Sequence, residues 1–279
     1  MRKAEETFFK ALMILCTAAI AGVLFLIVWT IVSRGASSLS WDMVSKIPEG
    51  GYYIGKGGGI LNAIIGSIYI TVGSVVLGLL ISVPVVLYIN VYAKKNSLLV
   101  NLTRFSFDIL FGIPSIVYGA FGFTIMVYFG LKTSLLAGVV TVTLLIIPIL
   151  VRAMDEVMRL VPDDLESITY SLGATRWETA QVLLRQSVPG ILTAVLLSFG
   201  RAIGDAACVL FTAGYTDSIP TSVDQPAATL PLAIFFQLSS PIKEVQNRAY
   251  AAALILTVLV LVLGLAAKYF GKKLSKNKI

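Results

Sequence analysis

Histidine is absent from the 279 residues, and cysteine occurs twice, as Cys16 and Cys208. Both cysteines lie inside apolar stretches and form neither a CxxC pair nor a cluster with other metal ligands. Structural zinc sites and disulfide frameworks need such clusters or several paired cysteines, so the sequence favours neither. Charged residues are also scarce, at 13%, whereas ordinary soluble domains carry roughly a quarter. The composition therefore argues against a soluble globular domain.

Apolar residues are abundant: they make up 57% of the chain, and the mean hydropathy is +0.88. A membrane-spanning helix needs about 20 consecutive apolar residues. Such runs occur at 11–33, 60–91, 109–130, 133–151, 190–213 and 249–267. The first run is longer than the apolar core of a signal peptide, so we favour a retained helix. The sequence predicts an all-α integral membrane protein with about six transmembrane helices.

The net charge of +7 reflects membrane orientation rather than nucleic-acid binding, because the basic residues flank the apolar runs. With the N-terminus inside, fifteen of the 22 Lys and Arg residues fall on the cytoplasmic side, six fall outside, and Arg201 lies within a span. Both termini are therefore predicted to be cytoplasmic. The basic tail, residues 268–278, fits either contact with anionic lipid headgroups or an orientation signal alone.

Two long loops, 34–59 and 214–248, are predicted outside the cell. Four prolines in the second loop exclude a long regular helix there. Residues 230–238 are apolar but too short to span. They fit a re-entrant or interfacial segment, or packing over the helix ends, which we favour.

The longest cytoplasmic segment, 152–189, has the marks of two short helices. Asp163 is a candidate N-cap for the first, and Gly173 supplies its C-terminal stop. Thr175 and Glu178 form the sequence pattern of a capping box for the second, which is expected to end before Pro189. The apolar stripes of the two helices fit either docking of a soluble partner or packing under the bundle.

This segment resembles the EAA loop of the permeases of bacterial ABC importers. The matching stretch is 167–177, and its best-fitting part is Leu172-Gly173-Ala174-Thr175-Arg176-Trp177. Ser167 stands where that family usually has glutamate, and Glu166 lies one residue early. The resemblance implies that these residues contact ATPase subunits. The set is Glu166, Ser167, Leu172, Gly173, Ala174, Arg176 and Trp177.

Further strings are similar to the PstA-type phosphate permeases: 58–64, 112–115, 201–205 and 228–232. The resemblance implies a type I ABC-importer permease domain over 58–279, preceded by a transmembrane helix and extracytoplasmic loop over 1–57. It also implies a phosphate importer in the cytoplasmic (inner) membrane of a bacterium or archaeon. The implied partners are a second related permease in a heterodimer, two ATPase copies and an extracytoplasmic phosphate-binding protein.

Arg201 and Asp205 are charged residues inside the predicted fifth span, where charge is costly and usually faces protein or a water-filled pathway. Their i, i+4 spacing places them on one helix face, and Gly200 and Gly204 would let another helix approach nearly the same side. A guanidinium suits a tetrahedral oxyanion such as phosphate. The alternative is a salt bridge that only fixes helix packing. Arg152 fits a second contact for the anion or a marker of the cytoplasmic boundary.

Residues 50–57 match G-x-x-x-x-G-K, but Gly57 replaces the Ser or Thr of a phosphate-binding loop. The chain is therefore expected to be no enzyme and to bind no cofactor, with ATP and magnesium used by the separate ATPase. Among alternatives, an importer of a sulfate- or molybdate-like oxyanion stays open. An ion-coupled secondary transporter is less favoured because no internal repeat and few membrane acids are visible. A membrane enzyme is weakly supported, since no titratable groups converge.

Overall fold

The computed structural model describes residues 2–49, 57–94 and 97–275. Most of the rejected phosphate-loop motif, and Lys56, Lys95, Lys276 and Lys278 of the orientation count, lie outside these residues. Regular structure within them is helical: α1 (Arg2–Ser38), α2 (Trp41–Ser45), α3 (Leu61–Leu87), the π-helix η1 (Tyr88–Tyr92), α4 (Leu98–Gly112), α5 (Ser115–Tyr128), α6 (Leu135–Arg159), α7 (Asp163–Ser171), α8 (Arg176–Ile203), α9 (Leu230–Leu238) and α10 (Lys243–Ser275).

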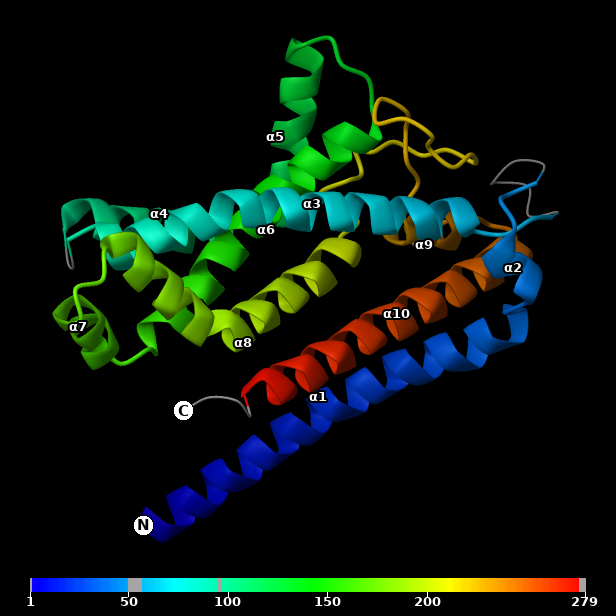
Figure 1. Ribbon diagram of the computed structural model, residues 1–279. Helices are drawn as coiled ribbons and strands as arrows, with labels where there is room; N and C mark the ends of the chain where they lie inside the picture. The colour runs from blue at the N-terminus through cyan, green and yellow to red at the C-terminus, as the bar shows by residue number, and fades with distance from the viewer. Residues whose placement is uncertain (1, 50–56, 95–96, 276–279) are drawn as a thin grey trace.

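Five of the described helices are long and apolar enough to cross a membrane, and the bent α4–α5 pair makes a sixth if it counts as one span. The prediction of an all-α membrane protein with about six spans is confirmed. In Figure 1 the start of α1 and the last described turns of α10 lie at the same end of the bundle as α7. The cellular side of that end stays a prediction.

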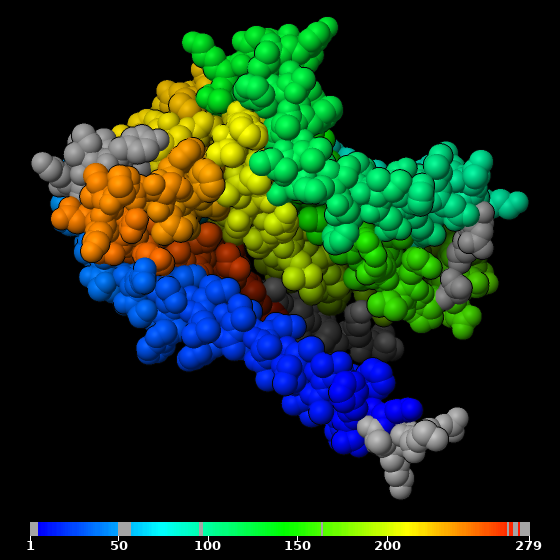
Figure 2. Space-filling model, turned by 180° about the vertical axis from the view of Figure 1, so that it is seen from behind, coloured from blue at the N-terminus to red at the C-terminus, as the bar shows by residue number. Residues whose placement is uncertain are grey.

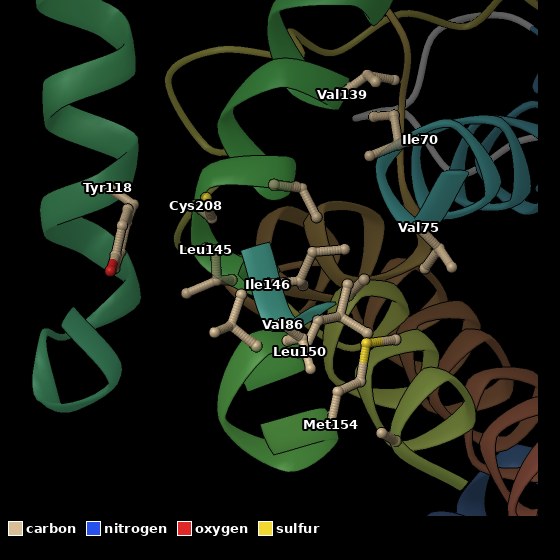
Figure 3. Packing of buried hydrophobic residues seen from close by; sticks show 14 of the residues in the cluster. Ile70, Val75, Val86, Tyr118, Val139, Leu145, Ile146, Leu150, Met154 and Cys208 are labelled. Atoms are coloured by element: carbon tan, nitrogen blue, oxygen red, sulfur yellow. The ribbon is translucent and has the colours of Figure 1, made fainter. Parts of the chain in front are cut away.

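Helices α3 and α6 cross at the centre of the bundle and supply most of its core (Figure 3). Small residues of α3 let α6 approach: a Cβ on Gly78 would lie 2.9 Å from Leu150 and 3.2 Å from Ile146. The Ser74 hydroxyl donates to the Val139 carbonyl at 3.0 Å. Close approach and side-chain hydrogen bonds of this kind hold helices together in lipid, which offers little hydrophobic drive between them.

Gly66 makes the closest backbone approach in α3, because a Cβ there would lie 2.0 Å from the Ala228 carbonyl oxygen. We expect Gly66→Val to displace the 227–233 segment and to lower the free energy of unfolding by about 1–3 kcal/mol, the usual cost of overpacking. The measurement is thermal unfolding of the purified protein in detergent. Gly22→Val is the matched control, since a Cβ at Gly22 meets no atom within 4 Å. Equal unfolding temperatures for both variants would contradict the prediction.

The pair formed by α1 and α10 lies along one edge of the molecule, as Figures 1 and 2 show from opposite sides. Gly35 of α1 packs against the backbone of Tyr250 in α10, and the Arg34 guanidinium donates to the Tyr250 hydroxyl at 3.1 Å. The apolar side chains of α1 are otherwise largely exposed, as suits a helix that faces lipid.

The apolar segment 230–238 forms α9, which packs against α10 and α3. Its N-terminus is capped by the Thr229 hydroxyl, and the Leu230 N–H donates to Ser67 of α3 at 2.8 Å. The segment packs against other helices, as the favoured interpretation requires, and the choice between that interpretation and a re-entrant or interfacial segment stays a prediction.

One predicted boundary was wrong. The third span does not begin at residue 109, because the chain bends by 99° between α4 and α5. Pro114 is the N-cap of α5 and lies in an extended conformation that a helix cannot contain. The fourth apolar run, 133–151, lies within a longer helix: α6 continues to Arg159, since a helix need not end where the apolar run ends.

Candidate functional site

Arg201 and Asp205 lie where α8 ends. The predicted fifth span, 190–213, is helical only to Ile203; Gly204 is the C-cap, and residues 205–213 form turns. The Asp205 carboxylate accepts the Cys208 N–H at 2.7 Å. An aspartate side chain can accept a backbone N–H in place of a helical carbonyl, and glycine is favoured at helix ends. The apolar run is therefore interrupted at the charged pair.

The structure brings Arg201 and Asp205 together: Nη2 of Arg201 lies 3.0 Å from Oδ2 of Asp205. The Asp205 side chain is 3% exposed and the Arg201 side chain 48% exposed. A guanidinium has five N–H donors, and Nη2 meets the carboxylate while about half of the side chain surface stays open. The arrangement can hold an anion on the open side of the guanidinium.

The face of α8 around this pair is open in the described chain. A Cβ at Gly200 would meet no atom within 4 Å, and one at Gly204 would meet only the Gly200 carbonyl, at 3.4 Å. Within the residues that the structure describes, no other helix uses the close approach that these glycines permit. No described helix of this chain therefore packs closely at Gly200 and Gly204, and only a helix of another chain could do so.

The turns that follow α8 are buried. Cys208, Val209, Thr212 and Ala213 are almost inaccessible, and Gly119 of α5 admits this backbone, because a Cβ there would lie 2.7 Å from the Ala207 carbonyl. Non-helical backbone at membrane depth is tolerated where protein buries it or where it lines a water-filled cavity. An interrupted helix beside a half-exposed arginine therefore marks a polar position within the bundle.

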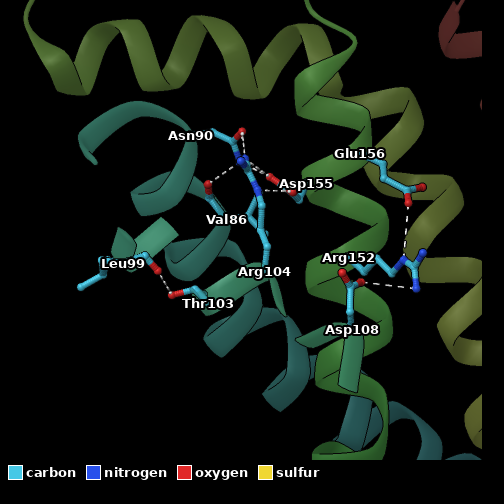
Figure 4. A network of polar contacts seen from close by, with 9 residues as sticks. All are labelled: Val86, Asn90, Leu99, Thr103, Arg104, Asp108, Arg152, Asp155 and Glu156. Atoms are coloured by element: carbon cyan, nitrogen blue, oxygen red, sulfur yellow. Dashed lines mark hydrogen bonds and ion pairs between the residues drawn. The ribbon is translucent and has the colours of Figure 1, made fainter. Parts of the chain in front are cut away.

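The contacts of Arg152 are with residues other than Arg201 and Asp205. Its guanidinium is 3.4 Å from Asp108 of α4 and 3.5 Å from Glu156 of α6 (Figure 4), and it stacks over the Phe111 ring at 5.0 Å. These partners hold it against the α4–α5 bend. Both roles of Arg152, contact with the anion and marking the cytoplasmic boundary, stay predictions.

The segment 152–189, predicted to be cytoplasmic, differs from the predicted pair of short helices. Helix α7 exists, but Pro162 rather than Asp163 is at the N-cap, without a side-chain cap hydrogen bond. Gly173 has φ +82° and ends the helix as predicted. The capping box of Thr175 and Glu178 is confirmed. The second helix is not short, because α8 passes through Pro189 without a break, as membrane helices often allow.

Five of the predicted coupling residues are exposed. Leu172 is 82% and Trp177 57% exposed, and Ser167, Gly173 and Arg176 are exposed as well. Several of the set also make contacts within the chain: the Ala174 N–H donates to the Thr169 carbonyl, Arg176 donates to the Tyr92 carbonyl at 3.4 Å, and the Ser167 carbonyl accepts the Ser171 hydroxyl at 2.8 Å. Glu166 lines a cavity beside Arg159 and Pro162.

An ion pair with an almost buried carboxylate was not predicted from the sequence. Arg104 of α4 makes a bidentate contact with Asp155 of α6, with both N···O distances 2.9 Å, and Asn90 of η1 donates to the same carboxylate at 2.8 Å (Figure 4). Asp155 falls on the buried stripe of α6 with Val151, Met154 and Met158. An acidic residue at a position where the helical spacing of apolar residues predicts the core was the sequence feature that could have revealed the ion pair. Nothing in the sequence pointed to Arg104.

These features define a class of protein. A bundle of membrane-spanning helices, a half-exposed arginine at an interrupted span and an exposed helix–turn–helix at the end that holds the termini are the marks of a transporter permease. The chain belongs to the family of binding-protein-dependent transport system inner membrane components, whose family model matches residues 74–276.

Among individual proteins, the chain is similar to permeases named for phosphate transport. The chain is 35% identical to the phosphate transport system permease protein PstA of Yersinia pestis over 94% of this chain and 89% of the relative. It is 36% identical to PstA of Xylella fastidiosa over 96% and 93%. A chain of the MetNI methionine ABC transporter, solved in an inward-facing conformation, matches 77% of this chain and 95% of its own length with a TM-score of 0.61 and 19% identity. That structure establishes the shared fold.

Proposed function

We propose that this chain is the transmembrane permease subunit of an ATP-driven importer of inorganic phosphate. The observation that carries the proposal is the half-exposed Arg201 guanidinium held by buried Asp205 at an interrupted membrane helix. The fork of an arginine matches tetrahedral oxyanions, and Asp205 offsets its charge, so that a bound anion can also leave. Relatives named for phosphate transport support phosphate over other oxyanions.

The continuity of α8 supplies a mechanism. Trp177 begins the exposed cytoplasmic surface and Arg201 lies in the last turn of the same helix. Twenty-four residues separate them in sequence, which corresponds to about 36 Å of helix at 1.5 Å per residue. Closure of ATPase subunits on α7 and the start of α8 would therefore move Arg201 as part of one rod. Such a movement alternates the side from which the anion reaches the guanidinium.

The half-exposed Arg201 supports a partner permease as well. An arginine facing lipid is costly, and the open surface at Gly200 and Gly204 would allow a partner helix to cover it closely. A second related permease, two copies of an ABC ATPase and an extracytoplasmic phosphate-binding protein complete the proposed complex. ATP and magnesium would act in the ATPase. Both termini would be cytoplasmic, in the inner membrane of a bacterium or archaeon.

The test is uptake of labelled phosphate into vesicles that contain this chain, the partner permease, the ATPase and the binding protein. We expect uptake that requires internal ATP and resists excess sulfate and molybdate. If excess sulfate or molybdate abolished the uptake, that anion would be the better candidate substrate, and the chain would still be a permease of an ATP-driven importer. Uptake that ignores ATP would contradict the importer assignment itself.

A further inference from the structure

The cluster of Arg104, Asp155 and Asn90, here called the buried cluster, joins three elements. Asp155 is almost buried on α6, where an unpaired carboxylate would be strongly unfavourable. Arg104 of α4 neutralises it through two hydrogen bonds, and Asn90 of η1 donates a third. Asn90 also donates to the Val86 carbonyl of α3 at 2.9 Å. The cluster therefore fixes the cytoplasmic end of α3 against both α4 and α6.

The element that carries Asn90 is a π-helix, in which one extra residue per turn is accommodated. The Ala93 N–H donates to the Tyr88 carbonyl at 2.8 Å, five residues back, which closes the π turn. The π turn ends α3, and the next residue, Ala93, is extended; π turns are a usual way for a helix to end. The position of Asn90 therefore helps to set where the last carbonyl of η1, that of Tyr92, lies.

The same π-helix touches the cytoplasmic segment. Two residues after Asn90, the Tyr92 carbonyl accepts a hydrogen bond from Arg176, the first residue of α8. The buried cluster thus holds η1 at Asn90. The start of α8 holds the end of η1 at Tyr92. A displacement of the start of α8 acts on η1 through this contact.

Cavities flank the buried cluster. One of about 240 Å³ lies between it and α7, with Asn90 and Arg104 on one side and Pro162 and Glu166 on the other. A second of about 190 Å³ borders Arg104 and Asp155 and reaches Arg152. Both are open pockets at the surface of the described chain, so space rather than packed side chains separates α7 from the cluster.

We propose that the buried cluster is a mechanical joint: it holds η1 in place at the end of α3 and so ties movement of α7 and the start of α8 to α3 and α6. This inference rests on the proposed function and assigns Arg104, Asp155 and Asn90 as positioning residues that do not touch the anion. Loss of the joint should separate ATP hydrolysis from transport and leave anion binding unchanged. A merely structural cluster would instead lower the amount of folded complex.

The experiment uses the complete complex in proteoliposomes and measures phosphate moved per ATP hydrolysed. Asn90→Ala is the main variant, because it removes the link to η1 and leaves the Arg104–Asp155 pair in place. We expect this ratio to fall by about fivefold or more, the lower range of typical coupling effects. The phosphate concentration that gives half-maximal uptake should not change. Arg104→Lys, which keeps the charge and loses the bidentate geometry, should lower the ratio less.

The matched control is Asp42→Asn in α2, which breaks an exposed ion pair with Lys46 of 3.0 Å at the other end of the bundle. Its ratio should equal that of the wild type. An Asn90→Ala complex that assembles poorly but keeps the wild-type ratio per assembled complex would overturn the inference and leave the proposed function standing. A wild-type complex that hydrolyses ATP and moves no phosphate would overturn the proposed function, and the inference with it.

Discussion

Uptake of phosphate should fall by about thirtyfold or more when Arg201 is replaced by alanine, as losing one partner of a charged hydrogen-bonded pair typically costs 2–5 kcal/mol. The permease should still assemble, because loss of the half-exposed Arg201 side chain leaves no core cavity in this chain. The buried Asp205 carboxylate loses its ion pair, which is unfavourable, but it keeps the hydrogen bond from the Cys208 N–H. The measurement combines ATP-dependent uptake with copurification of the ATPase and partner permease.

Two further variants separate substrate contact from helix packing. Arg201→Lys keeps the positive charge and loses the planar fork, so we expect partial uptake. Asp205→Asn keeps the shape of the side chain, including an oxygen for the Cys208 N–H, and removes the charge that offsets the guanidinium. We expect it to bind phosphate more tightly and release it more slowly. Uptake by Arg201→Ala at the wild-type rate would show that the pair only fixes packing.

Binding of the ATPase should become weaker when Trp177 is replaced by alanine. Tryptophan residues at interface centres often contribute 2 kcal/mol or more to binding, so the affinity should fall by about thirtyfold or more. Trp177 is 57% exposed beside the chain reversal at Gly173. The change should leave the fold intact, since the capping box that starts α8 uses Thr175 and Glu178. The measurement is titration of the reconstituted permease with purified ATPase.

Trp41→Ala is the matched control for this prediction. Trp41 is 80% exposed in α2, at the other end of the bundle from α7, so its loss should leave ATPase affinity unchanged. Equal affinities for Trp177→Ala and the wild type would contradict a coupling role for Trp177 and would favour packing under the bundle as the purpose of the stripe.

Some features of the site were predictable from the sequence because they depend on near neighbours in the chain. Hydropathy located the spans, since the thickness of a bilayer sets their length. The spacing of Arg201 and Asp205 predicted their contact, and the pattern at Thr175 and Glu178 predicted the capping box. Gly173 stopped α7 as expected, because its positive φ suits glycine.

The sequence by itself thus determined that this chain spans a membrane several times, and which residues form its short-range contacts. The tertiary structure decided where α8 ends, how the chain bends before Pro114, and that Asp155 meets Arg104 and Asn90. The physical reason is distance along the chain. Contacts between residues 51 or 65 positions apart depend on how whole helices pack, and helix packing also decides whether Pro189 breaks a helix or lies within it.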